Sequence, residues 1–167
     1  HQALPLWITK GINPNNKANY ERLLASGEVD FSASTRVRVQ SRQIFFYAAA
    51  YERGWCTQGK DIALAMMNFI RTEAHHPTAT AGFSHLWDAN WKIVDHKQDL
   101  YDHAFHLLAL GWCYRISKDN DYILEAKKII AHLDKQFGTA NGGWIEGDYA
   151  YNCRRQNPHM HLFEAFM

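Results

Sequence analysis

A pattern that recurs about every sixty residues restricts the fold of this chain more than any other feature. Ala81-Gly82-Phe83 and Gly142-Gly143-Trp144 lie 61 residues apart, and helix starts expected at 36, 97 and 157 are separated by 61 and 60 residues. Each period holds a first helix, a second helix and a short strand or hairpin. A unit of this kind buries its apolar face only by stacking on its neighbours. The pattern therefore predicts helix pairs packed side by side.

Apolar residues at helical spacing predict the individual elements of the array. Ser34 or Thr35 is expected to cap the first full helix, Asp119 or Asn120 the fourth, and Asn157 the last. The long apolar first helices are expected to form an inner layer and the charged second helices an outer one. Residues 1–20 hold a short apolar run at 4–7 and a loop signal at 13–16. The expected helices span 36–53, 61–74, 97–116, 121–136 and from 158 onward, and a hairpin spans 81–95.

Length and charge limit the possible functions. The 167 residues suit a single domain, 1–167, and 47% of them are hydrophobic. A net charge of +1 provides no general attraction to nucleic acid or anionic lipid, so neither is an expected partner. The sequence shows no membrane-span run and no secretory leader. The three cysteines have no zinc-ligand spacing and are expected to be reduced core thiols, which indicates a cytoplasmic protein.

Several polar residues occupy equivalent places in successive periods. Arg42, His103 and His161 are separated by 61 and 58 residues, and Tyr101 precedes His103 by two. In the last helix Asn157, His161 and Glu164 share one face at i, i+4 and i+7. Such a stripe faces either water or a polar cavity. The repeat favours a cavity, because it directs side chains from three periods to one place. Aromatic residues make up 14% of the chain and suit either a helical core or a polyol site.

Three segments, 36–43, 99–105 and 157–165, resemble the N-acylglucosamine 2-epimerase superfamily in order and spacing, and Arg154–His161 looks most like its mannose isomerase branch. The resemblance implies an all-α fold, an incomplete (α/α)6 barrel whose helix pairs are joined by short hairpins, with this chain as its N-terminal portion. It implies that Arg42 binds the sugar and stabilises an enediolate oxygen, and that Tyr101, Asn157 and His161 line the same pocket. His103 and Glu164 would support that pocket from behind. The two histidines that transfer the proton would lie beyond Met167, so no catalytic residue is expected here, and neither a cofactor nor a metal is implied.

The leading hypothesis is a sugar isomerase or 2-epimerase that acts on a free hexose by mannose–fructose type proton transfer. Such chemistry needs a base with a pKa near 7 and donors aimed at a developing oxyanion. A small-molecule sugar is the expected partner, and a homo-oligomer remains open. An N-acylglucosamine or cellobiose 2-epimerase is the first alternative. A glycoside hydrolase would need a carboxylate pair, for which Glu146 and Glu164 are the candidates. A non-catalytic helical-repeat scaffold would leave Arg42, Tyr101 and His161 without a shared cavity.

Overall fold

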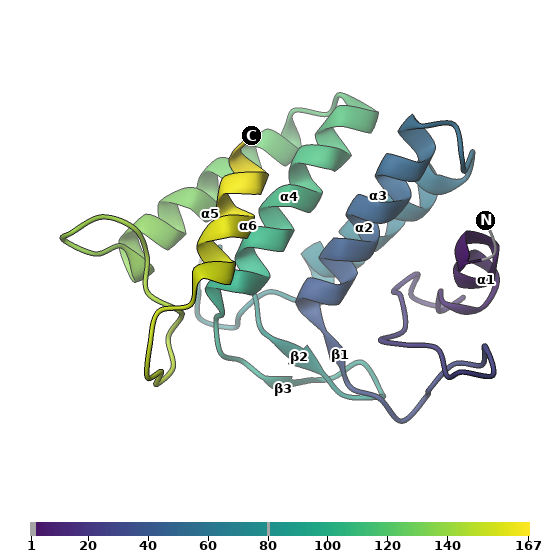
Figure 1. The fold of residues 1–167 in the computed structure, drawn as a ribbon, viewed down its shortest axis with the longest axis horizontal. Coiled ribbons are helices and arrows are strands. Elements are labelled where there is room, and N and C mark those ends of the chain that lie inside the picture. Colours follow the sequence, from purple (N-terminus) through teal and green to yellow (C-terminus); the bar gives the residue numbers. More distant parts are fainter. Residues whose placement is uncertain (1–2, 80) are drawn as a thin grey trace.

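The protein is described by a computed structural model that covers residues 3–79 and 81–167. Its helices and strands follow the expected order of helix pairs joined by short extended segments (Figure 1). The helices are α1 (Ala3–Lys10), α2 (Val37–Glu52), α3 (Gly59–Glu73), α4 (Leu100–Ser117), α5 (Asp121–Phe137) and α6 (Gln156–Phe166), and the strands are β1 (Thr35–Arg36), β2 (Leu86–Trp87) and β3 (Ile93–Asp95).

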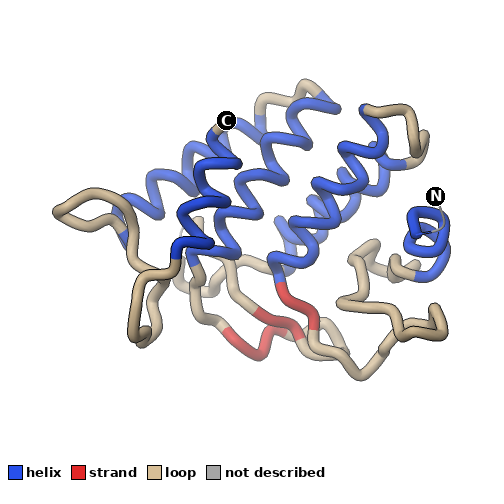
Figure 2. The backbone as a smooth tube through the Cα atoms, in the orientation of Figure 1, coloured by secondary structure: helices blue, strands red, loops and turns tan. Residues whose placement is uncertain are grey.

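The helices form two layers. The inner layer consists of α2, α4 and α6, which lie side by side, while α3 and α5 lie behind them (Figure 1). Helix α2 packs against α3 and α4, and α4 packs against α5 and α6. The strands lie at the end where α2 and α4 begin (Figure 2). This arrangement confirms the predicted stacking of helix pairs.

Burial follows the predicted difference between the two layers. Nearly every residue of α4 from Leu100 to Leu110 is buried, whereas α5 buries four: Tyr122, Ile129, Leu133 and Phe137. These four recur at the spacing of one helical face, and the opposite face of α5 exposes Lys127 and Lys128. A helix covered on all sides needs apolar residues around its whole circumference, which explains why the inner helix α4 is so apolar.

The hairpin is confirmed, and it belongs to a three-stranded antiparallel sheet in the order β1-β2-β3. Asp88 organises its turn, because Oδ1 accepts hydrogen bonds from the backbone N–H groups of Asn90 at 2.8 Å and Lys92 at 2.9 Å. Trp87 on β2 is fully buried, and its Nε1 donates to the Glu73 carbonyl at 3.2 Å. The hairpin is thereby tied to the end of α3.

Several local expectations are wrong. The segment Ala3–Lys10 forms a helix, with Pro5 in its first turn, where a proline is tolerated. Neither Ser34 nor Thr35 caps α2, because Thr35 pairs in β1 and the N-cap is Arg36. The N-cap of α6 is Arg155, so Asn157 lies inside the first turn. The two cap errors share a cause: an extended arginine runs directly into each of these helices, and neither N-cap makes a side-chain hydrogen bond to the helix.

Two further properties bear on the earlier expectations. Cys56 and Cys113 are buried free thiols, and burial raises the pKa of Cys113 to about 12, whereas Cys153 is exposed and is therefore not a core thiol. Among the helices of residues 3–79 and 81–167, none combines the length and apolar character needed to cross a bilayer.

Candidate functional site

A hollow of about 590 Å³ opens on the inner layer, where α2, α4 and α6 meet near α1. One face of α2 contributes at helical spacing, and single turns of α4 and α6 complete the lining. The hollow combines aromatic faces with a guanidinium, an amide, an imidazole and a carboxylate. Its lining residues are Ala3, Trp7, Val39, Arg42, Gln43, Phe45, Phe46, Phe105, Leu108, His161 and Glu164.

Three rings meet at one edge of this hollow. The His161 ring centroid lies 4.4 Å from that of Phe105 and 5.2 Å from that of Tyr101. Tyr101 and Phe105 lie one turn apart on α4, and their centroids are 5.1 Å apart in an edge-on arrangement. The two α4 rings therefore fix the imidazole of α6 from one side.

Arg42 contributes a cation to the hollow. Its guanidinium carbon lies 5.1 Å from the Phe105 ring centroid, which supports the group through its flat face. Arg42 is exposed, and no carboxylate within the described part of the chain forms an ion pair with it. A guanidinium keeps its charge at all relevant pH values and presents paired donors to neighbouring oxygens. Arg42 is thus available to bind an anionic or polyol oxygen.

His161 is oriented by Glu164, one turn further along α6. The Nδ1 atom of His161 lies 2.9 Å from Oε2 of Glu164. A neutral imidazole donates its Nδ1 proton to that carboxylate, which leaves Nε2 as the nitrogen available to a ligand. His159, two residues earlier on the same helix, points elsewhere, because its Nε2 accepts from the Trp144 backbone N–H at 3.4 Å.

The structure brings together only some of the predicted site residues. Arg42, His161 and Glu164 line the hollow, and Tyr101 contacts His161 at its edge. Asn157 lies exposed, one turn before His161 on the same helical face. The scaffold hypothesis required Arg42, Tyr101 and His161 to share no cavity, and the structure contradicts that requirement for Arg42 and His161.

His103 lies on the other side of α4 and is not part of the hollow. Its Nδ1 donates to the Asp99 carbonyl at 2.8 Å, and its Nε2 accepts from the Phe83 backbone N–H at 3.2 Å. The side chain is fully buried against the hairpin and α5, and the loss of solvation lowers its pKa to about 4. His103 is therefore a neutral, buried and hydrogen-bonded packing residue, and it does not point into the hollow with Arg42 and His161 as the repeat alone suggests.

The register of the repeat explains why the His103 side chain points away from the hollow. The inner helices begin at Val37, Leu100 and Gln156, so their starts are separated by 63 and 56 residues rather than by an even period. Positions that face the hollow repeat accordingly, from Arg42 to Phe105 and then to His161. His103 precedes Phe105 by two residues, which is a rotation of about 200° around the helix. A small error in the period thus moves a side chain to the opposite face.

The buried neutral His103 predicts a loss of stability in acid. Because its pKa is about 4 when folded and about 6.5 when unfolded, the unfolded chain binds the proton more readily, and stability falls as the pH drops from 6.5 to 4. The loss from this residue is about 3 kcal/mol. We expect His103→Gln to reduce the difference between urea unfolding free energies measured at pH 7 and pH 4.5. A part of that difference should remain, since burial also lowers the pKa values of His106 and His132. An unchanged difference would contradict the assignment, and His159→Gln, at a residue that is not fully buried, is the control.

The structure also shows features that the sequence interpretation missed. The aromatic floor of the hollow includes Phe105, Phe46 and Trp7, none of which was a candidate. The i, i+4 spacing of Tyr101 and Phe105 is the signal that could have indicated a shared face. Trp7 gave no such signal, because it belongs to α1 and reaches the hollow only through the tertiary fold.

The carboxylate pair required by the hydrolase alternative is not assembled. Glu146 is 1% exposed, and its two oxygens accept from the backbone N–H and Nε of Arg155, each at 2.5 Å. Glu146 does not line the hollow, whereas Glu164 does. A hydrolase would need both groups across one cleft. Glu146 instead ties its own loop to Arg155, the N-cap of α6.

The two layers of paired helices, with a polar hollow on the inner one, define an incomplete (α/α)6 barrel of the kind found in sugar epimerases and isomerases. The model of the N-acylglucosamine 2-epimerase (GlcNAc 2-epimerase) family matches residues 19–167, and the chain belongs to that family.

Known relatives agree with this assignment. Among curated proteins, the chain is 31% identical over 165 residues to a mannose-6-phosphate isomerase of Rhizobium meliloti (strain 1021), covering 98% of this chain and 42% of that protein. It superposes on a sugar epimerase from a ruminal bacterium with a TM-score of 0.85 and 24% identity, covering 98% of this chain and 45% of that protein. A D-mannose isomerase gives a TM-score of 0.85, 20% identity and coverage of 97% and 43%. The chain thus spans less than half the length of each relative.

Proposed function

We propose that the protein is a sugar isomerase or 2-epimerase that converts a free hexose, of the mannose–fructose type, through an enediolate. In this proposal residues 1–167 form one domain, the N-terminal portion of the barrel, which supplies substrate binding. The observation that carries the proposal is the guanidinium of Arg42, which has no ion-pair partner among residues 3–79 and 81–167, on the same hollow as the hydrogen-bonded pair His161 and Glu164. The proton-transferring residues are proposed to lie beyond Met167.

The chemistry of the hollow suits an open-chain sugar. Removal of the proton next to a carbonyl places negative charge on oxygen, and a fixed cation stabilises that charge more than it stabilises the ground state. Arg42 supplies such a cation, and Phe105 holds it in place. The aromatic faces of Phe46 and Trp7 offer contacts to the C–H groups of a sugar, and about 590 Å³ lies in the range of small-molecule sites.

Charge favours a free sugar over a sugar phosphate. Arg42 is the one Lys or Arg side chain among the residues that line the hollow, and Glu164 adds a negative group to the same lining. A phosphate of charge near −2 usually requires several convergent cations. The relative in Rhizobium is named for a phosphorylated substrate, so mannose 6-phosphate belongs in any test of this point.

The proposal is tested by NMR of the whole protein in D2O. We expect exchange of the C2 proton of mannose, with fructose as the product. Exchange with formation of the C2 epimer and no ketose would favour the epimerase alternative, for which an N-acylglucosamine and cellobiose are the substrates to add. Faster conversion of mannose 6-phosphate than of mannose would contradict the free-sugar assignment. No exchange with any of these sugars would overturn the proposed function.

Loss of the His161 imidazole is expected to weaken sugar binding. His161→Ala removes one hydrogen-bonding group and the ring that Tyr101 and Phe105 support. Loss of one such hydrogen bond lowers affinity by roughly tenfold. Isothermal titration with mannose measures the change. His159→Ala is the matched control, because that ring lies on the same helix but contacts Trp144. Equal effects of the two variants would show that His161 contributes only to the stability of α6.

A further inference from the structure

Two arginines of α2 lie over two aromatic rings of α4. The guanidinium carbon of Arg38 lies 5.4 Å from the Tyr101 ring centroid, and that of Arg42 lies 5.1 Å from the Phe105 centroid. The two arginines are one helical turn apart on α2, and the two rings are one turn apart on α4. The two contacts therefore form successive levels between the helices. Both rings in turn contact His161. The candidate site therefore has two cations of the same type beside it, in parallel settings.

The surroundings of the two arginines differ in charge. Nη1 of Arg38 donates to Oδ1 of Asp102 at 3.0 Å, and the Arg38 side chain is 19% exposed. The other carboxylate oxygen of Asp102 is hydrogen-bonded to Nδ1 of His85. Asp102 is 1% exposed, so both of its oxygens are buried and both are used. Arg38 is neutralised and fixed, whereas Arg42 is unpaired.

We propose that Arg38 and Asp102 are positioning residues, which hold the Tyr101 ring against His161 and so fix the imidazole at the edge of the hollow. Neither residue is among those that line the hollow. The contacts run from Asp102 to Arg38 by an ion pair, from Arg38 to Tyr101 by a cation–π contact, and from Tyr101 to His161 by an edge-on ring contact. The kinetic consequence rests on the proposed function, and the structural consequence for His161 does not.

A buried ion pair suits this positioning role. Its partners have little freedom, because each would leave an uncompensated charge if it moved away. The planar guanidinium also stacks on a ring in one orientation, which a lysine ammonium does not reproduce. Small errors in the position of a binding group can lower the rate of an enzyme by about a hundredfold. A buried ion pair that holds Tyr101 in place would therefore help to keep the geometry of the site.

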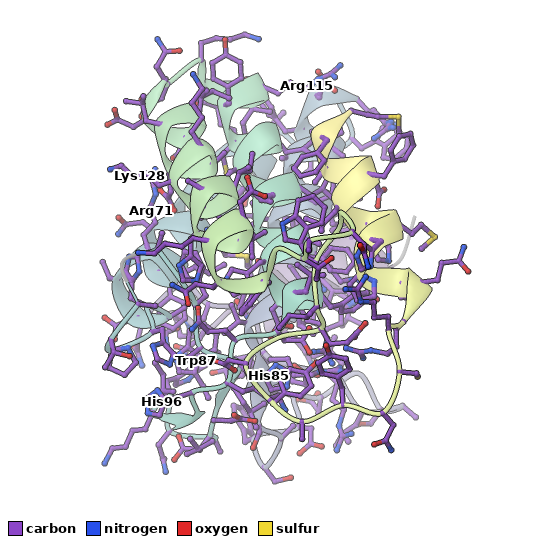
Figure 3. The ribbon with its side chains drawn as sticks, turned by 90° about the vertical axis from the view of Figure 1, so that its left-hand side faces the viewer. Arg71, His85, Trp87, His96, Arg115 and Lys128 are labelled. Atoms are coloured by element: carbon purple, nitrogen blue, oxygen red, sulfur yellow. The ribbon has the colours of Figure 1, made fainter. Side chains whose placement is uncertain are left out.

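The test compares Arg38→Met with Arg115→Met in the whole protein. Arg115 is a matched control, because it is also paired with a carboxylate, Glu52, and its guanidinium carbon lies 5.1 Å from a ring centroid, that of Trp112. It lies at the opposite end of the molecule from His85 (Figure 3). Two readouts are recorded for each variant: the NMR signals of the His161 imidazole without sugar, and kcat/KM from the C2 proton exchange.

We expect Arg38→Met to shift the His161 imidazole signals and to lower kcat/KM by roughly tenfold to a hundredfold, while Arg115→Met changes neither. Arg38→Lys should recover only part of the loss, because it restores the charge but not the stacking group. Wild-type signals and wild-type kcat/KM in Arg38→Met would overturn the inference, as would equal changes in Arg115→Met. If the wild-type protein exchanges no proton, the proposed function fails, and the imidazole signals alone decide whether Arg38 positions His161.

A second variant covers the case in which Arg38→Met does not fold. The double substitution Arg38→Met with Asp102→Asn removes both charges of the ion pair. No buried carboxylate then remains without its arginine partner. Because the two residues act as one unit, we expect the double variant to show the His161 shift and the same loss of kcat/KM as Arg38→Met. A folded double variant with wild-type His161 signals would overturn the inference.

Discussion

Replacement of Arg42 by methionine is expected to lower kcat for hexose isomerisation by roughly a hundredfold to a thousandfold, the usual effect of removing one preorganised group that stabilises a developing oxyanion. The expectation follows from the unpaired state of this guanidinium on the hollow and from its support by the Phe105 ring. Because the charge on the sugar oxygen grows toward the enediolate, the loss should fall more on kcat than on KM. Steady-state kinetics with mannose measure both constants.

The control for Arg42→Met is Arg53→Met. Arg53 follows the last residue of α2, and its guanidinium carbon is 5.4 Å from the Trp55 ring centroid, so it also lies over an aromatic ring, although this ring is exposed. We expect Arg53→Met to leave kcat and KM within twofold of the wild type, since surface substitutions away from a site have small effects. An Arg42→Met enzyme with wild-type kcat would show that another residue stabilises the enediolate.

Replacement of Trp87 by alanine is expected to lower the free energy of unfolding by about 3 to 5 kcal/mol, as for other large aromatic residues removed from a core. Trp87 is fully buried, its ring centroid lies 5.3 Å from that of Phe69, and its Nε1 bonds the end of α3. The substitution opens a cavity between the hairpin and the outer layer. Urea unfolding followed by far-ultraviolet circular dichroism measures the loss.

Trp55→Ala provides the comparison for Trp87→Ala. Trp55 is 69% exposed, so the same change of side chain removes little buried surface. We expect the free energy of unfolding of this variant to lie within about 0.5 kcal/mol of the wild-type value. Equal losses in the two variants would mean that burial does not determine the contribution of Trp87, and that the hairpin is not anchored by this side chain.

Local sequence was sufficient to predict the elements whose signals are repeated many times. Helices α2 to α5 were expected within three residues of their observed bounds, because each has several apolar residues at helical spacing and a marked end. Helix α1 was missed, since it has only eight residues and buries none of them fully, so its apolar run is too short to show a helical period. Caps were also misjudged, because strand pairing at Thr35 replaced a side-chain hydrogen bond.

The sequence predicted only part of the site. Arg42 and His161 were expected at one pocket with Glu164 behind it, and the structure places all three on one hollow. The repeat alone suggested the wrong direction for the His103 side chain, because that direction turns by about 100° with each residue and an error of two residues reverses it. The chemical types of side chain are local information, but their direction depends on the exact register between helices.

The sequence by itself determined the stacking of helix pairs, the inner and outer layers, and the resemblance to the family to which the chain belongs. Only the tertiary structure decided which charges are neutralised. Arg38 and Arg42 are four residues apart on one helix and look equivalent in the sequence. Of these two arginines, Arg38 is the one that pairs with Asp102, which comes 64 residues later in the chain. Ion pairing depends on distances across the fold that no local pattern records, and it leaves Arg42 as the cation free to meet a ligand.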